Sequence, residues 1–213
     1  LFRSSMLTRA PALPENSDST EALARSGALE ARFAQGPDDV RRAQELRYRV
    51  FYQEGRAIAD AHMSAAGRDA DTFDAICDHL LVIDHAPAPA TGLAAGSVVG
   101  TYRLLRQEIA EQHHGFYSEA EFGIGALIAR HKALRFLELG RSCVLEPYRN
   151  KRTLELLWHG IGHYTMQHRP DVMMGCASLD GTDPDKLALQ LSDRKSTRLN
   201  SSHSQQSRMP SSA

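Results

Sequence analysis

The sequence predicts one α+β domain built around a mixed, mostly antiparallel sheet with helices on its faces, in an α/β-like three-layer arrangement. Two β-rich runs, at residues 79–84 and 97–105, are joined by a Pro-, Ala- and Gly-rich loop, which is typical of an antiparallel hairpin. A third run, at 135–145, is followed by helical spacing and a short strand-like run, which indicates a parallel pair with a crossover helix. The 213 residues, 42% of them hydrophobic, are enough for one core.

Composition divides the chain into three parts. Residues 1–28 carry no sustained apolar periodicity and predict a flexible lead, and residues 29–192 carry the strand and helix patterns of the domain. Residues 193–213 are rich in Ser and basic residues, which predicts a disordered tail. Because the composition changes abruptly there, we expect this tail to be non-native and the domain to be truncated at its C-terminal end.

The first elements are a short strand at residues 28–34 and a helix that begins after Gly36 with Pro and two Asp residues. The apolar positions of this helix share one face: Ala43, Leu46, Val50 and Phe51. Arg47 falls within that face, where a cation is costly to bury unless it is paired or meets a ligand. Two interpretations stay open: an ion-paired or ligand-binding arginine, and a side chain that reaches solvent at the rim.

In the strand with the sequence "LELGRSC", strict alternation places Glu138 on one face, with Ser142 and Val144, and Arg141 on the other. Gly140 lies between the two charges, and a Gly inside a strand often marks a bulge that would change this facing. A lone Glu among apolar residues suits a general base. An ion pair of Glu138 with an arginine, Arg103 or Arg47, is the competing interpretation.

The same strand ends in "PYRNKRT", which leads into a helix predicted at residues 154–166. The first turn of a helix offers unpaired N–H groups and partial positive charge, so Arg149, Lys151 and Arg152 oppose the helix dipole unless an anion binds. The pattern predicts a site for an anion or an acidic partner; a solvated loop is the alternative. The predicted apolar stripe of the helix is Leu154, Leu157, Trp158, Ile161 and Tyr164.

Several function classes are disfavoured. A net charge of −1 argues against a globally basic nucleic-acid binder, and no window reaches the ~20 apolar residues of a membrane span. His159 and His163 have a spacing that zinc can use, but no third ligand is evident, so we expect no metal. The three cysteines lie in mainly apolar runs without metal spacing, which predicts buried thiols in a reducing cytoplasm.

A resemblance extends this interpretation. The segments "ELRYRVFYQE", "DTFD", "LLVID", "VVGTYRLL" and "LELGRSCVLEPYRNKRTLELLWHGIGHY", in this order, resemble the bacterial ornithine N-acyltransferases of ornithine-lipid synthesis, a GNAT-like, hemolysin-associated family related to acyl-homoserine-lactone synthases. The resemblance implies the GNAT, or acyl-CoA N-acyltransferase, fold. It also implies transfer of a (3-hydroxy)acyl chain from acyl carrier protein to the α-amine of ornithine, which gives lyso-ornithine lipid.

The resemblance also implies roles for residues. Glu138 is the expected catalytic base, and the expected substrate-binding residues are Arg47, Asp71, Asp74, Arg103 and Arg141. The expected contacts with the phosphopantetheine and its carrier are the backbone near Val144 and Leu145 and the cations Arg149, Lys151 and Arg152. Further cations would extend that positive surface: Arg130, His131, Lys132 and Arg135. "YRNKRT" replaces the Gly-rich pyrophosphate loop of acetyltransferases, which fits a carrier protein better than free coenzyme A.

We therefore expect no bound cofactor, with the phosphopantetheine thioester of acyl carrier protein as co-substrate and ornithine as acceptor. The expected location is the cytoplasm, with a peripheral contact at the inner membrane surface through the lipid product, and no nucleic acid is expected. Two alternatives stay open. One is an autoinducer synthase that uses S-adenosylmethionine, and the other is a non-catalytic module that binds acyl carrier protein.

Overall fold

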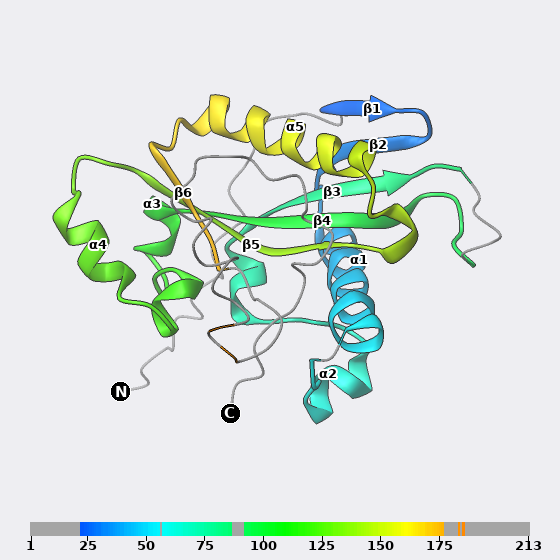
Figure 1. The fold of residues 1–213 in the computed structure, drawn as a ribbon, viewed down its shortest axis with the longest axis horizontal. Helices are drawn as coiled ribbons and strands as arrows, with labels where there is room; N and C mark the ends of the chain where they lie inside the picture. The colour runs from blue at the N-terminus through cyan, green and yellow to red at the C-terminus, as the bar shows by residue number, and fades with distance from the viewer. Residues whose placement is uncertain (1–21, 56, 87–91, 177–182, 184, 186–213) are drawn as a thin grey trace, which may run out of the picture.

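A computed structural model of the chain describes residues 22–55, 57–86, 92–176, 183 and 185. Its centre is a six-stranded sheet with the strands in chain order (Figure 1). The strands are β1 (Ala24–Ser26), β2 (Leu29–Phe33), β3 (Asp78–Asp84), β4 (Ser97–Arg106), β5 (Phe136–Val144) and β6 (Val172–Met174). All neighbours are antiparallel except β5 and β6, which are parallel and joined through a helix, as the sequence predicts.

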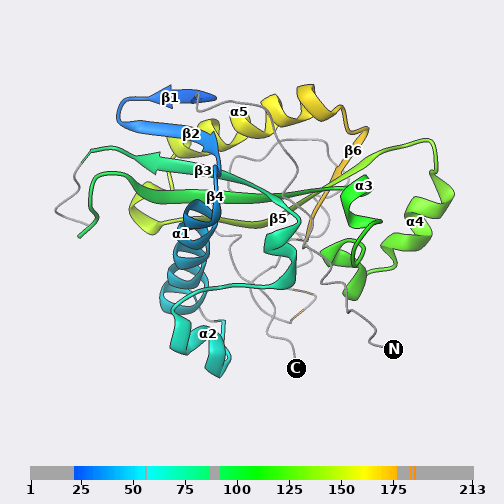
Figure 2. The same cartoon turned by 180° about the vertical axis from the view of Figure 1, so that it is seen from behind.

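The helices are α1 (Pro37–Tyr48), α2 (Ala61–Ala66), α3 (Gln107–Ala110), α4 (Ile124–Arg130) and α5 (Lys151–His168). A π-helical turn, Arg49–Glu54, continues α1, and short 3₁₀ turns occur at Thr72–Ala75, Tyr117–Ala120 and Glu146–Tyr148. The two long helices, α1 and α5, lie on opposite sides of the sheet (Figure 2).

The two sides of the sheet hold separate apolar cores because alternate residues of a strand point to opposite faces. In β3, Leu80 and Val82 pack in one cluster with α5, whereas Leu81 and Ile83 pack in another with α1. The predicted apolar face of α1 is confirmed, since its four residues all lie in the second cluster. A third cluster, centred on Leu105 and Phe136, lies at the α3 and α4 end.

The stripe of α5 differs from its prediction. The buried residues include Leu156 and Gly160, whereas Trp158 is exposed. Gly160 explains the rotation, because a Cβ there would lie only 2.4 Å from a methyl carbon of Leu80. The helix packs closest to the sheet at this glycine, which a hydrophobicity pattern does not count as an apolar position.

Two predictions about the limits of the domain meet different outcomes. The lead predicted at residues 1–28 is wrong at its end, because Ala24–Ser26 pair with β2 and Gly27, at a φ of +61°, makes the tight turn between them. Such a three-residue strand is too short to give a periodic pattern. The tail predicted at 193–213 lies outside the described residues.

The cysteines divide by environment. Cys143 is buried and Cys77 is partly buried, but Cys176 is exposed, so the prediction of three buried thiols is wrong for Cys176. It lies two residues after the end of the short β6. Among the described residues, no helix is long and apolar enough to cross a bilayer, and no group of three His, Cys, Asp or Glu side chains could hold a metal ion.

Candidate active site

A bulge in β5 sets the geometry of the site. Gly140 pairs with Arg103 and Cys143 pairs with Thr101, so three steps along β5 face two steps along β4. The extra residue lies at Arg141, which has a φ of +49°, and not at the glycine itself. The predicted bulge is confirmed, and it turns the side chain of Arg141 to the α1 side of the sheet.

The strict alternation expected for β5 is therefore wrong after the bulge. Glu138, Arg141 and Cys143 lie on the α1 side, whereas Val144 packs in the α5 cluster. One inserted residue shifts every later side chain to the other face, because the period of a strand is two residues. The bulge thus brings both charges of β5 to one side of the sheet.

On that side, three arginines and three aspartates form a closed ring in which charges alternate. Arg47 contacts Asp69 at 3.0 Å and Asp74 at 2.8 Å. Arg103 contacts Asp74 at 3.2 Å and Asp71 at 2.6 Å. Arg141 closes the ring, with Asp71 and Asp69 each at 3.1 Å. The ring has no formal net charge, and the side chains come from α1, β4, β5 and the segment before β3.

The ring is almost fully buried. The side chain of Arg47 is 0% exposed, and Asp71, at 20%, is the most exposed member. Burial alone would raise the pKa of Asp74, but the hydrogen bond and charge of Arg47 and the charge of Arg103 hold it well below its usual range. Burial likewise opposes the charge on Arg47, yet the carboxylates of Asp74 and Asp69 raise its pKa. Asp74 and Arg47 are thus both charged in the buried ring, because each is held by oppositely charged neighbours.

These contacts decide between the earlier interpretations. Arg47 is ion-paired and does not reach solvent at the rim, and Arg47 and Arg103 pair with aspartates instead of Glu138. Asp69 was not among the expected site residues, although it belongs to the ring. The spacing of three Asp before β3 signals it only weakly, because capped acidic loops are common; Asp71 does cap the 3₁₀ turn there.

Aromatic rings cover the open edge of the ring. The guanidinium of Arg141 lies 4.9 Å from the centre of the Tyr117 ring, and that of Arg103 lies 5.6 Å from it. Phe73 lies 5.5 Å from Arg103 on the same side and packs edge-on against Tyr117. These distances fit cation–π contacts, which hold the flat guanidinium groups in place. Tyr117 lies in a polar segment, so no sequence pattern indicated this role.

Glu138 holds the turn that carries Tyr117. Its Oε2 accepts a hydrogen bond from the Tyr117 N–H at 2.9 Å, and its Oε1 accepts one from the Ser118 N–H at 2.8 Å and another from the Ser118 hydroxyl. Glu138 is buried, and its carboxylate accepts hydrogen bonds from three donors. Of its two oxygens, only Oε2 accepts a single bond and so keeps capacity for another partner.

The backbone after the bulge turns one N–H group, that of Val144, away from β4. Strand β6 pairs with β5 only from Phe136 to Glu138, so the described part of β6 leaves the later part of that β5 edge uncovered. The N–H of Leu145 donates to Val99 O at 2.9 Å on the β4 side. Consecutive N–H groups of a strand point to opposite edges, so that of Val144 faces the uncovered edge. Of the two expected backbone donors, Leu145 is already engaged.

The basic turn at the start of α5 differs from the ring in exposure. Arg149 donates to Val144 O at 2.9 Å and to Glu54 at 2.8 Å, so it is fixed in the loop. Lys151 is 89% exposed and lies 3.4 Å from Glu155, and Arg152 has no ion pair among the described residues. The side chain of Asn150 accepts a hydrogen bond from Thr153 N–H and caps the helix.

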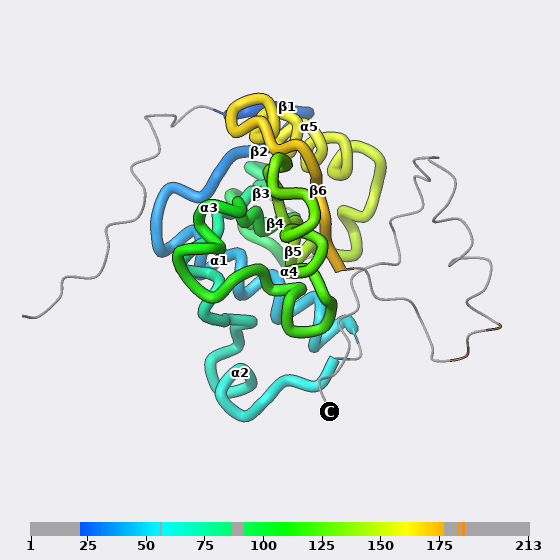
Figure 3. The backbone as a smooth tube through the Cα atoms, turned by 90° about the vertical axis from the view of Figure 1, so that its left-hand side faces the viewer, coloured from blue at the N-terminus to red at the C-terminus, as the bar shows by residue number. Residues whose placement is uncertain are grey.

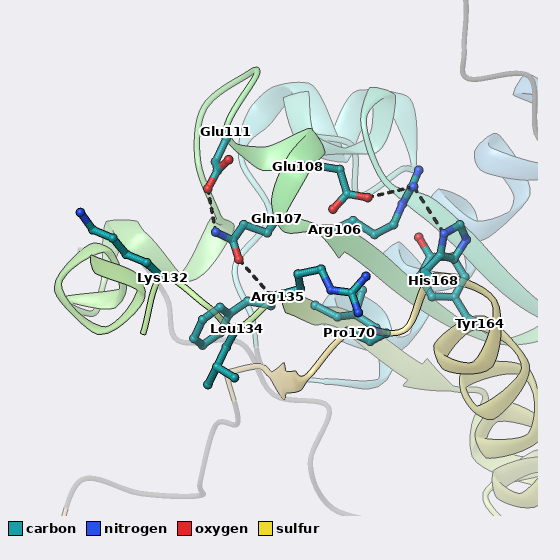
Figure 4. Close-up of a pocket in the computed structure, with 12 residues that line it drawn as sticks. Arg106, Gln107, Glu108, Glu111, Lys132, Leu134, Arg135, Tyr164, His168 and Pro170 are labelled. Atoms are coloured by element: carbon teal, nitrogen blue, oxygen red, sulfur yellow. Dashed lines mark hydrogen bonds and ion pairs between the residues drawn. The ribbon is translucent and has the colours of Figure 1, made fainter. Parts of the chain in front are cut away.

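Two hollows lie near these elements. One, of about 550 Å³, borders the basic turn and is lined in part by Tyr148, Asn150, Lys151 and Arg152. The other, of about 380 Å³, lies at the far end of α5 (Figure 4). There Arg106 bonds to Glu108 at 3.1 Å and to His168 at 3.4 Å. The lining of this second hollow includes Leu137 and Tyr164, which pack in the α5 cluster, and no residue of the ring.

Comparison with known proteins places the chain in a family. The family model described as an acetyltransferase (GNAT) domain matches residues 46–159. An L-ornithine N(alpha)-acyltransferase of Agrobacterium fabrum is 49% identical over 175 residues, which are 82% of this chain and 59% of that protein. One of Rhizobium meliloti is 49% identical over 173 residues, 81% of this chain and 57% of that protein. The chain thus spans less than two thirds of the length of these curated relatives.

A solved structure shares the fold. The structure of FeeM, an N-acyl amino acid synthase from uncultured soil microbes, matches with a TM-score of 0.50 at 10% identity, over 77% of this chain and 76% of that one. At this identity the likeness shows the fold alone. Since the family model covers more than half of the 213 residues, the chain belongs to the GNAT acetyltransferase family.

Proposed function

We propose that the protein that carries this chain is an N-acyltransferase that moves a (3-hydroxy)acyl chain from acyl carrier protein to the α-amine of ornithine. The product is lyso-ornithine lipid, and the reaction is the first step of ornithine-lipid biosynthesis. The observation that carries the proposal is the 49% identity with two curated L-ornithine N(alpha)-acyltransferases over more than four fifths of the chain. Membership of the GNAT family supports the reaction type.

The acceptor amino acid binds at the open edge of the charge ring. Asp71 is the most exposed ring member, at 20%, so its carboxylate is placed to meet a cationic group of the acceptor, and Arg141 holds that carboxylate from 3.1 Å away. Arg47 and Asp74 are too deeply buried to touch a ligand in this arrangement, and they act by holding the rest of the ring in place around Asp71. The aromatic face of Tyr117 covers the alkyl part of the acceptor.

The acyl donor lies along the uncovered edge of β5. The amine nitrogen attacks the thioester carbonyl carbon, the carbon–sulfur bond breaks, and the thiolate of the phosphopantetheine leaves. The Val144 N–H donates to the carbonyl oxygen as its negative charge develops. Glu138 takes the proton of the attacking amine through a water molecule at Oε2, the oxygen with one hydrogen bond.

The carrier docks on the basic turn. Lys151 and Arg152 border the hollow of about 550 Å³ at the start of α5, and both are exposed. Carrier proteins are acidic around the prosthetic group, so these cations fit them by charge. We place the enzyme in the cytoplasm, at the inner surface of the membrane that receives the lipid product.

Product analysis tests the proposal. The full-length protein is incubated with a 3-hydroxyacyl carrier thioester and a panel of ornithine, lysine, glutamine and S-adenosylmethionine, and the products are identified by mass spectrometry. We expect an amide on the α-amine of ornithine. A lactone formed from S-adenosylmethionine would replace the proposal with an autoinducer synthase, and carrier binding without any amide would replace it with a binding module.

A matched pair of variants tests the role of Glu138. Glu138→Gln removes the base, and Ser118→Ala removes one donor to the same carboxylate but leaves the base in place. If Glu138 accepts the proton, Glu138→Gln lowers kcat by roughly 10²–10⁴-fold, whereas Ser118→Ala has a small effect. Equal losses in the two variants would assign Glu138 only the task of positioning Tyr117.

A further inference from the structure

An exposed surface around α4 combines large apolar side chains with cations. Seven large hydrophobic side chains are exposed in the described part of the chain, and three of them belong to this one segment: Phe122 at 53%, Leu127 at 37% and Leu134 at 36%. Arg130 and Lys132 lie between them in sequence and are exposed. These five residues are called the α4 surface below. A cluster of apolar residues at the surface commonly marks an interaction site.

The exposed apolar residues are not the side of α4 that packs against the rest of the protein. Helix α4 already packs Ile124 and Ile128, four residues apart, against the buried cluster around Phe116 and Phe136. The side of α4 that faces the protein is therefore already packed through Ile124 and Ile128. Leu127 does not belong to this packed side and is exposed. The helix therefore has an apolar side toward the protein and further apolar residues toward the outside, next to cations.

The charge on this segment has one sign. Residues 122–135 contain no Asp or Glu. Arg130 bonds only to the carbonyl of Ala126, at 3.4 Å, and neither Arg130 nor Lys132 has an ion pair among the described residues. Lys132 extends away from the other labelled side chains (Figure 4). The cations of the α4 surface are available for an anionic partner.

The α4 surface lies far from the basic turn. β5 runs between them, and its eight steps at ~3.3 Å each separate its ends by roughly 26 Å. α4 precedes the first end and α5 follows the other (Figure 1). Figure 3 looks along the sheet from the α4 end and shows α4 in front. A carrier protein whose prosthetic group enters at the basic turn therefore does not account for the cations of the α4 surface.

We propose that the α4 surface binds an anionic lipid bilayer. Phe122, Leu127 and Leu134 enter the interface between headgroups and acyl chains, and Arg130 and Lys132 bind the phosphate groups, as in other helices that lie on membranes. The turn that carries Tyr117 directly precedes α4, so the acceptor side of the site faces the membrane. This orientation rests on the proposed function, in which the product is a lipid, but binding to a bilayer can be measured without it.

Co-sedimentation of the full-length protein with vesicles tests the proposal. Vesicles of phosphatidylglycerol and phosphatidylcholine in equal parts are compared with phosphatidylcholine alone. We expect binding to the anionic vesicles that falls as salt rises. Arg130→Ala with Lys132→Ala should weaken binding about 25-fold, or about fivefold for each cation, and Phe122→Ser with Leu127→Ser should weaken it on either vesicle.

A matched control changes the same kinds of residue elsewhere. Ile58→Ser with Arg41→Ala removes an apolar side chain and a cation that are also exposed, at the α1 and α2 end, and should leave binding unchanged. Absence of binding by the unchanged protein would overturn the proposal, as would equal binding by the α4 variants. A loss of acyl-carrier affinity with intact vesicle binding would assign the surface to the carrier instead.

Discussion

The charge ring and the basic turn each contain three cations, and the structure treats them in opposite ways. In the ring, every arginine contacts two aspartates, and five of the six side chains are nearly inaccessible to solvent. In the turn, Arg149 is held by Glu54, but Lys151 is almost fully exposed and Arg152 has no ion pair among the described residues. The comparison teaches that the position of the anions, and not the number of cations, decides which cations remain accessible to an anionic partner.

The physical costs differ accordingly. Three buried arginines are tolerated only because their attraction to three carboxylates offsets the free energy lost on desolvation. Removal of one member leaves its neighbours with a missing partner. The cations of the turn lose little hydration, but they oppose the dipole of α5. A substitution in the ring should therefore reduce stability, whereas one in the turn should reduce binding and leave the fold intact.

The largest expected effect is in the ring. Arg47→Met leaves Asp69 and Asp74 buried without this partner, so the free energy of unfolding should fall by ~3–5 kcal/mol. Urea unfolding followed by circular dichroism measures it. The control, Arg41→Ala, removes exposed pairs with Asp38 and Glu45 and should change stability by less than about 0.5 kcal/mol. Similar losses in both variants would contradict a structural ring.

Substitutions in the turn should have a smaller effect, on KM for acyl carrier, and should keep or raise stability instead of lowering it. Lys151→Glu with Arg152→Glu should raise KM for acyl carrier about tenfold at low salt, which corresponds to ~1.4 kcal/mol. The same change favours the helix dipole, by roughly 0.3–1 kcal/mol per residue, and should keep or raise the melting temperature. Steady-state kinetics over a range of salt concentrations measure the first effect. A change confined to KM for ornithine would place the carrier elsewhere.

The smallest effect concerns pH and a histidine beside the ring. His79 is buried, and its Nε2–H donates to the Asp74 carbonyl at 3.1 Å. Burial lowers the pKa of His79 from its usual value of 6.5. The unfolded chain therefore binds a proton that the folded protein does not, so stability should decrease as pH falls below about 6.5.

Urea unfolding at a series of pH values measures this decrease. His79→Asn should flatten the slope between about pH 6.5 and pH 5, and the exposed control His62→Asn should leave it unchanged. The pKa of Asp74 is held low, so its own contribution is lost only at more acidic pH, below its usual value of 3.8. An unchanged slope in His79→Asn would assign the acid sensitivity to other groups.

The fold could be predicted largely from local patterns. The β-rich runs of β3 and β4, the helical spacing in α1 and the strand–helix–strand order around α5 each reflect a local preference that the structure keeps. The short β1 and the rotation of α5 at Gly160 could not be predicted, because both depend on contacts with residues far away in sequence.

The site could be predicted only in part. Charges within apolar elements singled out Arg47, Arg103 and Arg141, and the family resemblance added Asp71 and Asp74. The sequence could not assign partners, since Arg141 meets Asp71 from 70 residues away. It signalled Asp69 only weakly, as one of three acids before β3, and it missed the turn of Tyr117 and Ser118. A polar segment gives no periodic signal, and the contacts of this turn with Glu138 exist only once the chain has folded.

The closure of the ring limits how the sequence can change. Removal of one residue leaves an odd number of charges and a net buried charge, whereas removal of a neighbouring arginine and aspartate together leaves four alternating charges in a neutral row. The six positions should therefore vary in oppositely charged pairs and not singly. In a library randomised at Arg47 and Asp69, the folded members should retain both charges or neither, and selection for folded protein followed by sequencing would reveal this parity.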